Sequence, residues 1–157
     1  MSTTDRIEKQ IELKAPVSRV WRAITDYQEF GTWFRANLET PFIAGQTSQG
    51  KITYPGYEHL VMVVSVQKVE PEHLFSFHWH PYAVDPAMDY SSEPPTLVEF
   101  KLEATATGTL LRLTESGFDS LPVSRRDLAL RMNDGGWTAQ MKNIENHVDN
   151  CSPEPRP

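Results

Sequence analysis

The sequence predicts an α+β fold, in which a curved antiparallel sheet of about six or seven strands wraps around a long C-terminal helix and two short helices follow the first strand. Three observations favour this fold class. Apolar and polar residues alternate in most segments before residue 120, as they do in strands with one buried face. Apolar residues recur at helical spacing just after Pro16, and a long proline-free stretch after Pro122 has the same spacing.

The N-terminal segment Arg6–Leu13 is expected to be the first strand, because its aliphatic residues fall mostly at alternating positions. Pro16 follows, and it suits the first turn of a helix. Two short helices are then expected, since apolar residues recur at helical spacing. They are Val17, Val20, Trp21 and Ile24 in the first helix, and Tyr27, Phe30, Trp33 and Phe34 in the second. Gly31 interrupts the second pattern, so the form of that helix stays open.

The middle of the sequence has the β-branched and aromatic composition of strands. Strands are expected over residues 51–54, 59–70 and 74–80, and prolines in turn sequences follow the first two. The third strand alternates most regularly. Its two faces carry Phe75, Phe77 and Trp79 on one side, and Ser76, His78 and His80 on the other.

Residues 81–95 have no usable period and contain prolines in quick succession, so we expect a long loop that acts as a functional lid. A hairpin is expected after it. Its strands are residues 97–105 and the segment around Leu111 and Leu113, joined by a turn at Thr107-Gly108. One face of this hairpin is apolar, and the other carries charged and polar residues that solvent would contact.

The C-terminal helix is expected to have one apolar stripe, formed by Trp137, Met141, Ile144 and Val148. Gly135 and Gly136 each cost a helix about 1 kcal/mol relative to alanine. Either the helix starts afresh there, or its backbone approaches a neighbour closely. Residues 1–150 are expected to form a single domain, followed by a flexible tail over 151–157.

The composition excludes several classes of function. The formal net charge is −6 and no segment is rich in Lys and Arg, so we expect no nucleic-acid partner. Residues 1–14 lack the apolar core of a signal peptide, and no stretch of about 20 apolar residues predicts a membrane span. The cytoplasm is therefore the expected location. The only cysteine, Cys151, lies in the polar tail, so neither a disulfide nor a thiolate metal site is expected.

The expected architecture leaves a cavity, because one helix is too narrow to fill the concave side of a curled sheet. Inward-facing aromatic and apolar side chains would line it and would adapt to an apolar or aromatic small molecule. The candidate ligand-binding residues are Trp33, Phe34, Phe75, Phe77, Trp79, Phe100, Leu113, Trp137 and Met141. The alternative at each of these positions is ordinary core packing.

Few residues are candidates for chemistry. His78 and His80 share a strand face and would need a third ligand such as His59 or Asp85 to bind a metal. Two solvated histidines and no metal site are the preferred interpretation. Glu115 has the parity of the inner face, which makes it a weak catalytic candidate for proton transfer, although a hydrogen-bonded residue at the end of a strand is preferred. No nucleophile, oxyanion donor set or phosphate loop accompanies it, and no cofactor is predicted.

Two motifs resemble those of a known family. The sequence Pro-x-x-x-Val-Trp-x-Ala-Ile-Thr-Asp at residues 16–26, with Trp33 after it, resembles the opening motif of the START-like, or SRPBCC, superfamily. Residues 113–118 together with Gly136-Trp137 are similar to the closing motif of its branch named after the activator of the heat-shock protein 90 ATPase. The resemblance implies a helix-grip fold with a cavity between helix and sheet. Its members include lipid carriers, polyketide cyclases and a chaperone cofactor, so the fold does not determine the function.

The leading hypothesis is a protein that binds a lipophilic or aromatic small molecule in this cavity. Two alternatives stay open. One is an enzyme of the cyclase or aromatase type, in which Glu115 moves a proton. The other is an interaction module that stimulates a chaperone ATPase, although the chain lacks the separate domain that the eukaryotic activator carries. A monomer or a weak homodimer is expected.

Overall fold

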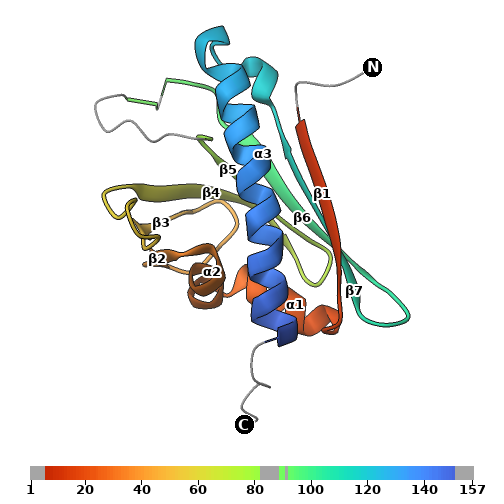
Figure 1. Cartoon of the computed structure of the whole chain (residues 1–157). Helices are drawn as coiled ribbons and strands as arrows, with labels where there is room; N and C mark the ends of the chain where they lie inside the picture. The colour runs from red at the N-terminus through yellow and green to blue at the C-terminus, as the bar shows by residue number, and fades with distance from the viewer. Residues whose placement is uncertain (1–5, 82–88, 91, 151–157) are drawn as a thin grey trace, which may run out of the picture.

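The computed structural model describes residues 6–81, 89–90 and 92–150, and it confirms the α+β fold class (Figure 1). A seven-stranded antiparallel sheet has the strand order β1-β7-β6-β5-β4-β3-β2. Figure 1 shows the long helix α3 running along one face of this sheet, with the two short helices near its C-terminal end. This is the arrangement of a helix-grip fold.

The sheet is a meander with one added edge strand. Its strands are β1 (Arg6–Leu13), β2 (Ala36–Leu38), β3 (Thr47–Ile52), β4 (Val61–Glu70), β5 (Leu74–Trp79), β6 (Thr96–Ala104) and β7 (Thr109–Ser116). β1 pairs with β7, where Ile7 lies opposite Glu115. The bounds of β1 agree with the prediction, and β3 lies earlier in the chain than predicted. The short strand β2 was missed, because three residues are too few for a period.

Two short helices follow β1: α1 (Val17–Thr25) and α2 (Tyr27–Phe34). Asp26 separates them and caps α2, since its side chain accepts hydrogen bonds from two backbone N–H groups of the first turn. Gly31 does not interrupt α2. A Cβ atom there would lie 2.1 Å from the carbonyl oxygen of Ala36, so glycine allows β2 to pass close to the helix.

A short 3₁₀ turn, η1 (Phe118–Ser120), leads into α3 (Val123–Glu145), which continues as a π-helical segment, η2 (Asn146–Asn150). Both interpretations of the glycine pair were wrong. The helix is continuous through Gly135 and Gly136, and a Cβ atom on either would have no neighbour within 4 Å. None of the described helices is long and apolar enough to span a membrane.

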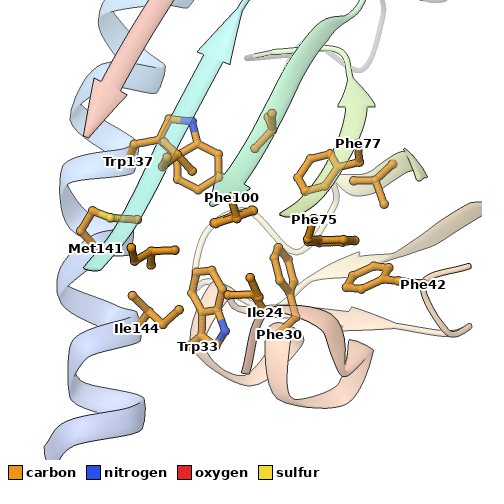
Figure 2. Close-up of a cluster of buried hydrophobic side chains, with 14 of the residues drawn as sticks. Ile24, Phe30, Trp33, Phe42, Phe75, Phe77, Phe100, Trp137, Met141 and Ile144 are labelled. Atoms are coloured by element: carbon orange, nitrogen blue, oxygen red, sulfur yellow. The ribbon is translucent and has the colours of Figure 1, made fainter. Parts of the chain in front are cut away.

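The core lies between α2, α3 and the concave face of the sheet. Figure 2 shows aromatic rings from α2, β5 and β6 pointing toward one another in this space. Phe75 and Phe77 have ring centroids 5.7 Å apart, and Phe30 lies 6.5 Å from Phe100. All four side chains are fully buried. The centre of the predicted hollow is therefore filled, because rings of α2 occupy the space that α3 alone would leave open.

An ionic cluster joins α1 and α2 to the end of the C-terminal helix. Glu29 accepts hydrogen bonds from Arg19 at 2.8 Å and Arg22 at 2.7 Å, and it lies 2.9 Å from Nε2 of His147. Burial acts to raise the pKa of Glu29. Hydrogen bonds with His147, Arg19 and Arg22, together with the charge of Arg19, outweigh burial and lower that pKa below its ordinary value.

Replacement of Glu29 by Gln is expected to lower the free energy of unfolding by about 1–2 kcal/mol at neutral pH, because the amide loses the charge-assisted bonds. A carboxyl whose pKa is lowered by folding stabilises the protein fully above its unfolded-state pKa, near 4.5, and loses this effect as the pH falls through the folded-state pKa. Urea unfolding at several pH values measures the difference between the two proteins. The difference in free energy of unfolding between wild type and Glu29→Gln should decrease below pH ~4.5.

The matched control is Glu70→Gln, because this carboxylate is exposed at the end of β4. We expect it to change the free energy of unfolding by less than about 0.5 kcal/mol. A difference between wild type and Glu29→Gln that is constant over the whole pH range would contradict the assignment.

Candidate functional site

The structure places two adjoining pockets beside α3 rather than at the centre of the sheet. The smaller has a volume of about 150 Å³, and the larger has a volume of about 400 Å³. Phe34, Trp79 and Asn133 line both. The smaller pocket adds Gly136, Trp137 and Gln140, and the larger adds Ile52, Leu60, Val61, Met62, Val63, His80 and Tyr90. Both are open to solvent.

Three aromatic rings from three elements form one wall of the smaller pocket, and two of them, Phe34 and Trp79, also line the larger pocket. The centroids of Trp79 on β5 and Trp137 on α3 are 5.7 Å apart, and their planes are inclined by 34°. The ring of Phe34, at the end of α2, lies 5.9 Å from the first and 6.0 Å from the second. The wall therefore depends on how α2, α3 and the sheet pack together.

A fully buried carboxylate, that of Glu115, holds both indole rings. It accepts hydrogen bonds from Nε1 of Trp79 at 2.7 Å and from Nε1 of Trp137 at 2.8 Å. Oγ1 of Thr96 donates at 2.5 Å, and Nδ2 of Asn133 lies 3.0 and 3.3 Å from the two carboxylate oxygens. Four donors from β5, β6 and α3 thus converge on one side chain of β7.

These bonds confirm the interpretation of Glu115 as a hydrogen-bonded residue near the end of a strand. Neither pocket is lined by Glu115. The arrangement suits the orientation of the rings and of Asn133, because a carboxylate accepts at both oxygens. Its role in proton transfer stays an untested prediction.

The nine predicted ligand-binding residues fall into two groups. Phe34, Trp79 and Trp137 come together at the smaller pocket. The other six are buried in the core and line neither pocket: Trp33, Phe75, Phe77, Phe100, Leu113 and Met141. Core packing, the alternative that the sequence left open, describes their surroundings in the structure. Whether any of the nine contacts a ligand stays a prediction.

The sequence did not identify the polar and glycine positions that α3 contributes to the wall. Asn133 lies four residues before Trp137, and Gln140 lies three residues after it. This spacing puts all three residues on neighbouring parts of one helix face. The spacing of Asn133 and Gln140 relative to Trp137 could have indicated these positions, but an analysis of apolar residues alone does not include them.

His78 of β5 and His80, just after this strand, are partly buried, so the prediction that they are solvated holds only in part. In the sheet, His78 lies between Ser65 of β4 and Leu97 of β6. His80 lines the larger pocket, and its Nδ1 atom is buried with no hydrogen-bond partner among the described residues. Within the part of the chain that the structure describes, no three His, Cys, Asp or Glu side chains gather as metal ligands would.

The predicted lid covers residues 81–95, of which 82–88 and 91 lie outside the described residues, as does the candidate ligand Asp85. Both ends of this segment are attached to the start of α3. Arg125 donates to the carbonyl oxygen of Pro81 at 2.9 Å and forms an ion pair of 2.8 Å with Glu93. Its guanidinium also lies 4.6 Å from the ring centroid of Tyr90. The function of the segment as a lid stays a prediction.

The sequence of residues 14–149 matches the family described as activator of Hsp90 ATPase homolog 1-like proteins. The chain belongs to this family. The START-like resemblance is thereby confirmed, and the motifs around Trp21 and Trp137 lie within the matched region. No curated protein matches the chain.

Solved structures share the fold of this family member. Protein MLL2253 from Mesorhizobium loti has a TM-score of 0.73 and 24% identity, over 94% of this chain and 98% of its own. The Aha1 dimer from Colwellia psychrerythraea has a TM-score of 0.68 and 17% identity, over 92% of this chain and 96% of its own. DynU16, from the dynemicin biosynthetic locus, has a TM-score of 0.71 and 22% identity, over 92% of this chain and 47% of its own. Identities this low show the fold alone.

Replacement of Glu115 by Gln is expected to lower the free energy of unfolding by about 1–3 kcal/mol, because whichever oxygen becomes the amide nitrogen was the acceptor of an indole N–H and of at least one further donor. The near-ultraviolet circular dichroism of the tryptophans should change with it, since both indoles depend on the same carboxylate. Urea unfolding and the dichroism spectrum measure the two effects. Glu103→Gln, on the exposed face of β6, is the control and should leave both unchanged. An unchanged spectrum in Glu115→Gln would contradict the role assigned to this residue.

Proposed function

We propose that this member of the family binds an apolar or aromatic small molecule in the two adjoining pockets beside α3. The observation that carries the proposal is the aromatic wall of Phe34, Trp79 and Trp137 in the smaller pocket, of which Phe34 and Trp79 also line the larger one. Both pockets are open to solvent. The larger pocket, of about 400 Å³, falls within the range of about 300–1,000 Å³ that small-molecule sites occupy. A ligand would enter from the open side, and the packed core would stay closed.

The composition of the walls supports this function. Small-molecule sites combine a large apolar surface with a few fixed polar groups that orient the ligand. Here the rings of three elements supply the apolar surface, and Asn133, Gln140 and His80 supply polar groups. Both indole rings are fixed by Glu115, so a flat ligand would meet a wall that is already ordered.

The other hypotheses have less support from the described residues. A cyclase-type reaction would require substrate to reach Glu115, which lines neither pocket. Stimulation of a chaperone ATPase rests on the family description alone. The Colwellia psychrerythraea protein is a dimer, and for this chain a monomer or weak homodimer remains a proposal, as does a cytoplasmic location.

Replacement of Gly136 by Leu is expected to block binding of N-phenyl-1-naphthylamine, an uncharged fluorescent probe. A side chain at residue 136 would enter the open space of the smaller pocket, because Gly136 lines it and a Cβ atom added there would have no neighbour within 4 Å. The dissociation constant should rise by about tenfold or more. Probe fluorescence and intrinsic tryptophan fluorescence measure it.

The matched control is Gly135→Leu, which has the same free space but does not line either pocket. Both variants gain about 1 kcal/mol of helix propensity, so neither should lose affinity through unfolding. Gly135→Leu should bind the probe as the wild type does. A wild type that does not bind, or two variants with equal affinity, would refute the proposed site.

A further inference from the structure

The described residues that line the two pockets are of uncharged types, apart from the imidazole of His80. Among the described residues that line them there is no Asp, Glu, Lys or Arg. An ionised group that leaves water without a partner of opposite charge loses more free energy than apolar contact returns. Among the described lining residues a carboxylate or phosphate ligand finds no Lys or Arg, and the nearby Arg125 lies against Tyr90 and is paired with Glu93, so an uncharged ligand fits the site better.

Asn133 lines both pockets, and Glu115 fixes the orientation of its amide. Nδ2 lies 3.0 and 3.3 Å from the two carboxylate oxygens, and only the nitrogen end of an amide can donate to them. The carbonyl oxygen Oδ1 is the polar atom that remains. Within the described residues, no donor forms a hydrogen bond with it.

The second amide on this face of α3 is already used at both ends. Nε2 of Gln140 donates to the backbone carbonyl of Phe34 at 3.3 Å, and its Oε1 accepts from Nδ2 of Asn143 at 2.9 Å. Gln140 thus joins α3 to α2, and beside these two bonds its amide keeps one N–H donor and one lone pair. Oδ1 of Asn133 is the amide oxygen on this face of α3 that has no hydrogen-bond partner among the described residues.

We infer that Asn133 selects an uncharged aromatic ligand that carries a hydroxyl or N–H donor, and this inference rests on the proposed function. The ring packs against Trp79, Trp137 and Phe34, while the donor forms a hydrogen bond with Oδ1 of Asn133. Glu115 acts as a positioning residue, because its hydrogen bond with Nδ2 keeps the oxygen of the amide available. A hydroxylated aromatic compound is the chemical class that meets these conditions.

Three naphthalenes of similar size test the inference: 2-naphthol, 2-methoxynaphthalene and 2-naphthoate. Only the first is both uncharged and a hydrogen-bond donor at neutral pH. Isothermal titration should give a dissociation constant for 2-naphthol about five- to tenfold lower than for 2-methoxynaphthalene, the range of one hydrogen bond. Binding of 2-naphthoate should be the weakest of the three.

Asn133→Leu should remove the preference for 2-naphthol over 2-methoxynaphthalene, because it removes the acceptor and leaves the aromatic rings in place. Gln140→Leu is the control, and it should affect both ligands alike. The wild-type series stands as a test by itself if Asn133→Leu fails to fold.

Equal affinity of the wild type for 2-naphthol and 2-methoxynaphthalene would overturn the inference and leave the proposed function intact. A preference that persists in Asn133→Leu, or tighter binding of 2-naphthoate, would overturn it too. Absence of binding by all three compounds would overturn the proposed function together with the inference.

Discussion

The shared hydrogen bonds of Glu115 are the constraint on which the rest of the site depends. A buried carboxylate is costly unless donors replace the water that it loses, and here four side chains replace it. Two of these donors, Trp79 and Trp137, belong to the sheet and to α3. Their common acceptor therefore fixes the distance between helix and sheet at the point where the pockets open. The same group orients the amide of Asn133, so one residue links the packing of the fold to the polarity of its site.

The fold could be predicted because the local spacing of apolar residues indicates which side of each helix or strand is buried. Alternation in β1 and helical spacing in α1 and α3 record which face of each element meets the core. The same parity placed Glu115 inside. Its donors could not be found in this way, since Trp79 lies 36 residues away and Trp137 lies 22 residues away. The position of the pocket was also beyond the patterns, because they do not say that Phe30 would fill the centre of the sheet.

Helix propensity and contacts with neighbouring elements vary along α3. Its C-terminal end is tied to α1 and α2 through the contact of His147 with Glu29. The section beside the pockets contains Gly135 and Gly136, which together lower helix propensity by about 2 kcal/mol. At Gly136, the absence of a side chain also leaves the smaller pocket unobstructed. The helix is thus attached to its neighbours both at its C-terminal end and beside the pockets, and its intrinsic helix propensity is lowest beside the pockets.

The pairing of β1 with β7 governs when this architecture can be completed. The two strands join residues separated by about a hundred positions, such as Ile7 and Glu115, and non-local pairs of this kind slow folding. During synthesis on the ribosome, β1 cannot pair with β7 until most of the polypeptide has emerged. β7 also carries the carboxylate that orders the indole rings. A nascent chain consequently cannot form the ordered wall of the pockets until translation is almost finished.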